Sequence, residues 1–116
     1  MLIAAALFLL AAAILPTIRA VAQQAVVTDE NITQMIGSAK TPSEHEAIAA
    51  FFDEKAAKAQ QEAKNHRAWG QIYGKPAMMS HCGYLAKANQ DEADQYKALA
   101  AGHREIAEMA KKAAEQ

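Results

Sequence analysis

The five residues from Met78 to Cys82, MMSHC, place two thioethers, an imidazole and a thiol within one short segment. On a helix, Met78 shares a face with both His81 and Cys82, because residues three and four positions apart are neighbours. Thiolate, thioether and imidazole together suit a soft ion such as Cu(I), or haem iron. The segment therefore predicts a metal or haem site. In the alternative interpretation, the methionines are flexible core residues and Cys82 is a small buried apolar residue.

Cys82 is the only cysteine of the chain, so no disulfide can form within it. Its thiol is therefore free, paired with another chain, or bound to a ligand. If a helix begins at Ser80, Cys82 lies in the first turn, where the helix dipole favours the thiolate and hence a reactive or dimerising thiol. The sequence contains no CxxCH motif, which excludes covalent attachment of a c-type haem.

Two long helices must position these residues. The segment TPSEHEAIAAFF begins with an N-cap threonine, Thr41, followed by proline at the first helical position and glutamate three residues after the cap. Good helix formers dominate from there to about Ala68. The composition of WGQIYGKP, residues 69–76, indicates a turn. We expect a second helix to run from Pro76 or Ser80 to the C-terminus.

Heptad spacing predicts how these two helices pack. The first helix carries two rows with a period of seven, which are His45, Phe52, Ala59 and His66, and, between them, Ile48 or Ala49, Ala56 and Ala63. The second carries two such rows, which are Cys82, Asn89, Tyr96, His103 and Ala110, and Leu85, Glu92, Leu99, Ile106 and Ala113. This period is typical of helices that cross at a shallow angle. We therefore expect both rows of the second helix to face the first helix.

A tight turn near Gly74 makes the two helices antiparallel, so residues whose numbers sum to about 148 should lie at the same level. His45 then faces His103, and His66 faces Cys82. We name His45 and His103 as cofactor-binding candidates, because two facing imidazoles can hold haem or contribute to a zinc or copper site. The metal-binding candidates are His66, Met78, His81 and Cys82. In the alternative interpretation, each histidine hydrogen-bonds a neighbouring carboxylate or backbone group.

Residues 23–40 contain a linker and a short helical segment, which Thr28 can cap and Gly37 ends. The predicted fold class is therefore all-α, with a short N-terminal helix followed by a long antiparallel helical hairpin over residues 41–116. So small a core rarely supplies more than about 3–5 kcal/mol. We expect the short helix, or a second copy of the chain, to complete a helical bundle.

The N-terminal segment MLIAAALFLLAAAILPTIRAVAQQ differs from the rest of the chain. Residues 2–15 are uninterruptedly apolar, and Ala-Val-Ala at 20–22 fits the small-x-small rule for signal cleavage. The first interpretation is a signal peptide over residues 1–22 and an exported, periplasmic mature protein, although no Lys or Arg precedes the apolar run. The alternative is a retained membrane anchor over residues 2–18, which approaches the roughly 17–25 residues that span a bilayer.

Charge and motifs narrow the classes of function. The chain has 116 residues and a formal net charge of −1, and no stretch forms a basic stripe. This argues against nucleic acid as a partner. A membrane is expected as a partner only if the N-terminal segment is retained. The sequence has no Gly-rich phosphate loop, nucleophile elbow or carboxylate pair in an evident cleft, so we expect no enzyme activity.

The runs TPSEHEAIAAFF…AKAQQEAKNHRAW and MMSHC…LAKANQDEADQYKALAAGHREIAEMA resemble a group of small exported bacterial helical proteins. That group shows the order TPxEHxxxA, a histidine that ends the first helix, an HC pair, and a late LAxxH. The matching positions are Thr41, Pro42, Glu44, His45, His66, His81, Cys82 and His103. The resemblance covers residues 41–110 and implies an exported bacterial helical hairpin, without implying an activity.

Three functions follow from these features. The first is a small exported non-enzymatic protein that acts by helix–helix association, as a homodimer or with a helical partner protein. The second is a periplasmic haem or copper-binding protein that uses the facing histidines and Cys82. The third is an accessory subunit of a membrane complex, held by an uncleaved N-terminal transmembrane helix.

Overall fold

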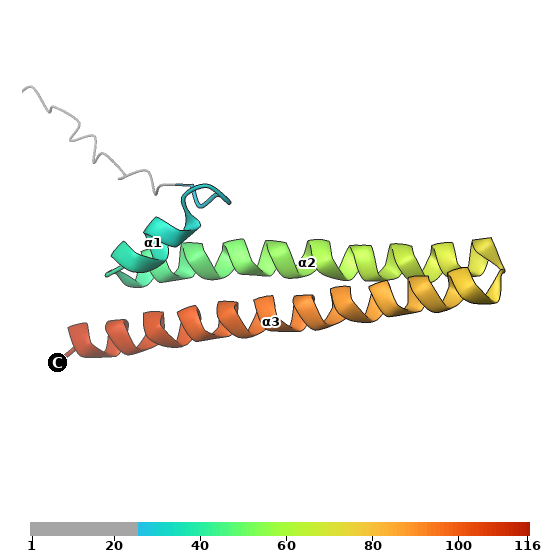
Figure 1. Ribbon diagram of the computed structural model, residues 1–116. Coiled ribbons are helices and arrows are strands. Elements are labelled where there is room, and N and C mark those ends of the chain that lie inside the picture. The colour runs from blue at the N-terminus through green and yellow to red at the C-terminus, as the bar shows by residue number, and fades with distance from the viewer. Residues whose placement is uncertain (1–25) are drawn as a thin grey trace, which may run out of the picture.

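The computed structural model describes residues 26–116, and within them it contains three helices and no strand (Figure 1). They are α1 (Ile32–Ser38), α2 (Pro42–Tyr73) and α3 (Pro76–Ala114). α2 and α3 run antiparallel, side by side, and α1 lies against the first part of α2. The all-α prediction, with a short helix and a long hairpin, is confirmed. The predicted signal peptide or anchor over residues 1–22 lies outside the described residues, and none of the helices within 26–116 has the length and apolarity to cross a bilayer.

The predicted capping box fixes the start of α2. The backbone N–H of Glu44 donates to the Thr41 hydroxyl at 3.2 Å, and the Thr41 N–H donates to the Glu44 carboxylate at 3.0 Å. Pro42 occupies the first helical position, where its missing N–H leaves no intrahelical bond unmade. Backbone hydrogen bonds from Lys40 and then Thr41 lower the pKa of the Glu44 carboxyl. Local sequence alone therefore specifies this helix end.

The turn of the hairpin is shorter than its composition indicates. α2 was expected to end near Ala68, yet it continues to Tyr73, and only Gly74 and Lys75 separate it from α3. Gly74 has a φ of 62°, the left-handed conformation that glycine adopts at helix ends. The other glycine of the segment, Gly70, is buried inside α2. It marks a close approach of helices rather than a turn.

Small residues let α2 and α3 approach closely. The buried small residues recur every seven positions on both helices, and they are Ala49, Ala56, Ala63 and Gly70 on α2 and Ala86, Ala93, Ala100 and Ala107 on α3. A Cβ atom added to Gly70 would lie 3.2 Å from the Cβ of Cys82 and 3.6 Å from the Cα of Met79. Contacts this short leave room for little more than a methyl group at these positions.

One of the two predicted rows of α3 does not face α2, and this corrects the heptad assignment. Cys82 is buried and Tyr96 packs against the core, so that row is in place. In the other row, Leu99 and Ile106 are 47% and 44% exposed, and Glu92 is exposed as well. The inner face uses the alanine one position after each of these residues, because the short helix–helix distance selects the smaller side chain.

α1 begins later than predicted. Thr28 caps a turn before the helix, where its N–H donates to the Asn31 side chain at 2.7 Å, and the helix itself starts at Ile32. α1 then places Ile32 and Met35 against the apolar core formed around Ile48. This small core at one end of the hairpin contains the largest fully buried side chain, Ile48.

Ion pairs on one flank of the hairpin fix the register of α2 against α3. Arg104 pairs with Asp53, and Lys111 pairs with Glu46 at 2.6 Å. In both pairs the two residue numbers add up to the same value, and the pairs lie seven residues apart along each helix. Both pairs are therefore consistent with one alignment of α2 against α3. These side chains are about half exposed, so they contribute more to register than to stability.

Candidate functional site

His45 and His103 make a direct contact between α2 and α3, as their spacing predicts. Their Nδ1 atoms are 3.0 Å apart, and their rings stack with centroids 5.3 Å apart. A hydrogen bond at this distance requires one Nδ1 to carry a proton and the other to accept it. The two Nδ1 atoms therefore hydrogen-bond to each other, and this hydrogen bond would have to break before either Nδ1 could bind haem or a metal.

Aromatic rings extend this contact into a stacked column. The Phe52 ring stacks on both His103 and Tyr96, with centroids 6.0 Å apart in each case. Burial, and then the neighbouring His45, lower the pKa of His103. Burial, and then the Glu92 carboxylate, raise the pKa of Tyr96. Both shifts favour the neutral rings, so the column behaves as part of the core.

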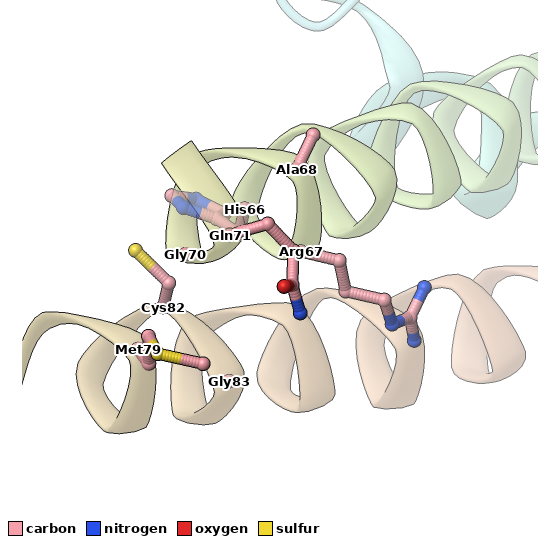
Figure 2. A pocket seen from close by; sticks show the side chains of 8 residues that line it. All are labelled: His66, Arg67, Ala68, Gly70, Gln71, Met79, Cys82 and Gly83. Atoms are coloured by element: carbon pink, nitrogen blue, oxygen red, sulfur yellow. The ribbon is translucent and has the colours of Figure 1, made fainter. Parts of the chain in front are cut away.

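A pocket of about 360 Å³ opens on the flank of the hairpin near its turn (Figure 2). Its lining comes from both helices and consists of His66, Arg67, Ala68, Gly70, Gln71, Met79, Cys82 and Gly83. Only 4% of Cys82 is exposed, and its thiol points from α3 toward α2 on the side where His66 lies. Met79 lies three residues before Cys82 on α3 and also lines the pocket, with its thioether directed along α3 toward Gly83 in Figure 2. The pocket thus brings together a thiol, a thioether and an imidazole.

His66 carries a buried nitrogen without a partner. Its ring packs edge-on against Trp69, with centroids 5.0 Å apart. Its Nδ1 is fully buried and has no hydrogen-bond partner among residues 26–116. Leaving such an atom unsatisfied costs about 1–3 kcal/mol, so it needs a physical explanation. Trp69 also lies beside Ile72 and Tyr73 in an exposed apolar cluster at the end of α2.

Two of the predicted metal ligands lie apart from this pocket. His81 is exposed and Met78 is half-buried, and neither lines the cavity. Met79 occupies the place that spacing assigned to Met78. The sequence signal for Met79 was available, because Met79 precedes Cys82 by three residues. The residue numbers of Met79 and Gly70 also add up to nearly 148, the sum expected of residues that face each other across the hairpin.

The structure also decides the position of Cys82 within its helix. α3 begins at Pro76, so Cys82 lies beyond the first turn, and the first-turn interpretation of a reactive thiol, which required a start at Ser80, is wrong. Within residues 26–116, no cluster of three or more His, Cys, Asp or Glu side chains is arranged around a metal position. The pocket instead combines one histidine and one cysteine with a methionine.

α3 carries a second, outward-facing apolar row, which was missed because Leu99, Ile106 and Ala113 were expected to face α2. The outer row consists of Leu99, Gly102, Ile106, Met109 and Ala113. These residues follow one another at intervals of three and four, the spacing of a helix-packing face. Leu99, Ile106 and Met109 are large apolar residues that the structure leaves exposed.

Comparison of the chain with protein-family models, with curated proteins and with solved structures finds no match. The function must therefore be inferred from the residues themselves.

Proposed function

We propose that this protein is a small exported non-enzymatic protein that acts by helix–helix association, and that its partner is a second copy of the same chain. The observation that supports this proposal is the outer row of α3, defined above. Leu99 and Ile106 are close to half exposed, and Met109 is 64% exposed. Exposed apolar residues that recur at helix-packing intervals are typical of an interaction surface, whereas scattered ones are not.

The outer row has the composition of a close-packed interface. Gly102 lies between Leu99 and Ile106 on the same face, and apart from the adjoining part of α3 itself no atom lies within 4 Å of the position where its Cβ would be. A facing helix could therefore approach here, with the larger side chains packing on either side of the glycine. The row covers about four helical turns, which is sufficient for two antiparallel copies to bury each other's apolar side chains.

A second copy is favoured as the occupant by symmetry and by charge. A twofold axis across the outer row would pair the same surface from both copies, which is the commonest form of oligomer. The chain has a formal net charge of −1, so two copies repel each other only weakly. Two hairpins joined along α3 would also give the four-helix arrangement that a thin alanine-lined hairpin lacks.

The test is the molar mass of the purified protein in solution. The full gene product is exported from a bacterial host, and its mass is measured by sedimentation equilibrium and light scattering over a wide concentration range. The expected result is a dimer that Leu99→Lys and Ile106→Lys each convert to a monomer. Ile72→Lys, at a residue that is 80% exposed on α2, is the matched control and should leave the dimer intact.

Circular dichroism of each variant must show unchanged helix content, since otherwise loss of the dimer reflects misfolding. A wild-type protein that stays monomeric at all concentrations would refute the proposal, as would a dimer that survives both substitutions in the outer row. A monomer that associates through this row with a different helical protein would refute the choice of partner but retain the surface.

The role as an accessory subunit of a membrane complex depends on residues 1–22, which lie outside the described residues, and it stays a prediction. The mass of the same exported protein tests it. A chain that begins after residue 22 excludes the retained anchor, and a chain that keeps Met1 supports it.

A further inference from the structure

We propose that the pocket near the turn binds one Cu(I) ion, with the Cys82 thiolate, the Met79 thioether and the Nδ1 of His66 as ligands. This inference is independent of the proposed dimer, because the pocket and the outer row lie at opposite ends of α3. It rests on the chemistry of three side chains that both helices bring to one cavity.

The buried nitrogen of His66 is the first observation that points to a ligand. Its Nδ1 is shielded from solvent and has no hydrogen-bond partner among the described residues. Native proteins almost always pair such atoms with a protein group, a water molecule or an ion. Here the same ring belongs to the lining of a cavity that also contains the chain's one thiol.

The packing of the helices is the second observation. Gly70 lacks the Cβ atom that would lie 3.2 Å from the Cβ of Cys82, so the two helices bring Cys82 close to the backbone of α2. Cys82 is buried and therefore held in place, while Met79 is 40% exposed at the mouth of the pocket. The exposed, unbranched Met79 side chain can rotate its thioether toward the thiol, and a soft ion can enter from that side.

The charge balance selects Cu(I) among the ions that these groups can bind. As the S–Cu bond forms, the Cys82 thiol loses its proton to solvent, and copper stays in the +1 state throughout, so no electron is transferred. The Cu(I) and the thiolate together carry no net charge, which suits a site at the buried Cys82. Zn²⁺ would leave a net positive charge there and prefers four ligands.

Neighbouring residues of the same type provide matched controls. Met78 and His81 lie in the same segment as the proposed ligands but do not line the pocket. Their substitution should leave Cu(I) affinity unchanged. Removal of a group that only supports a metal ligand costs about 10–100-fold in affinity, so loss of a direct ligand should cost at least about tenfold.

The experiment is an anaerobic competition titration of the full-length exported protein with Cu(I) held by bathocuproine disulfonate. The expected result is one Cu(I) per chain, with at least about tenfold weaker binding in Cys82→Ser, Met79→Leu and His66→Phe. Met78→Leu and His81→Phe should bind as the wild type does. Zn²⁺ is titrated in parallel and is expected to bind much more weakly.

Three results would overturn the proposal: no competition for Cu(I), equal losses in the control variants, or binding of Zn²⁺ as tightly as Cu(I). Met79→Leu preserves size and lies at the surface, so it remains informative if Cys82→Ser or His66→Phe disturbs folding. Leu99→Lys, which tests the dimer, should retain full Cu(I) binding, so failures of the two proposals are distinguishable.

Discussion

Replacing His103 by phenylalanine should destabilise the protein through the atom that it leaves behind on His45. The two rings are stacked, and their Nδ1 atoms are 3.0 Å apart. Phenylalanine can keep the stacking on Phe52 but offers no hydrogen-bond partner. Because His45 is only 9% exposed, its Nδ1 becomes a buried polar atom without a partner, at a cost of about 1–3 kcal/mol.

The double variant His45→Phe/His103→Phe tests this reasoning. Replacement of both hydrogen-bonding partners by apolar groups of similar shape can be nearly neutral, because no polar atom is left unsatisfied. We therefore expect each single variant to lose about 1–3 kcal/mol, and the double variant to lose less than the sum of the two. Urea unfolding at pH 7.5, followed by circular dichroism, measures all four free energies of unfolding.

The lowered pKa of His103 also predicts how the free energy of unfolding changes with pH, and the same variants test it. Burial and the neighbouring His45 lower the pKa of His103 in the folded protein, so the unfolded chain binds a proton at a higher pH than the folded chain does. The contribution of His103 is therefore complete above its unfolded pKa of about 6.5 and is lost as the pH falls through the lower, folded value. The double variant should lack this part of the acid destabilisation. Additive losses in the single variants, or an unchanged pH profile in the double variant, would refute the account.

Three further pairs of substitutions test the packing of the hairpin and the cap of α2 by urea or thermal unfolding. Gly83→Ala should stabilise α3 by about 0.5–1 kcal/mol, whereas Gly70→Ala should fall short of that gain or destabilise, because its new Cβ would meet a facing Cβ at 3.2 Å. Equal gains in the two variants would contradict the close approach. Ile48→Ala should cost about 2–5 kcal/mol, because its side chain is fully buried, and Ile72→Ala at the exposed control position should cost less than about 0.5 kcal/mol. Thr41→Ala should cost about 0.5–2 kcal/mol through loss of the cap, and Thr41→Asn, which can also cap, should restore most of it.

Local signals in the sequence were sufficient for the start of α2 and for the antiparallel register of α2 and α3. The capping box at Thr41 requires only residues within one turn, so it could be recognised without any tertiary information. The facing of His45 and His103 followed from the position of the turn and a period of seven. Both predictions depend only on how far apart residues lie along a helix, and this follows directly from their spacing in the sequence.

Predictions that depended on the angle around the helix were less successful. From Cys82, the next inward residue can lie three positions later, at Leu85, or four positions later, at Ala86. Hydrophobicity favours leucine, but the structure buries the alanine. The distance between the two helices decides between them, and that distance depends on every small residue along both helices. Met79 lines the pocket and Met78 does not for a related reason, since their positions depend on the rotation of α3 as well as on spacing.

The placement of large and small side chains on α3 also bears on the proposed association. Ala100 and Ala107 are buried, while their neighbours Leu99 and Ile106 remain nearly half exposed. Burial of apolar area contributes roughly 25 cal/mol per Å², so an isolated hairpin would gain more by turning the leucine and isoleucine inward. The observed rotation instead gives close helix contact inside and a continuous larger-residue face outside. That arrangement gains its full hydrophobic stabilisation only when another helix covers the outer row, which supports the proposed dimer.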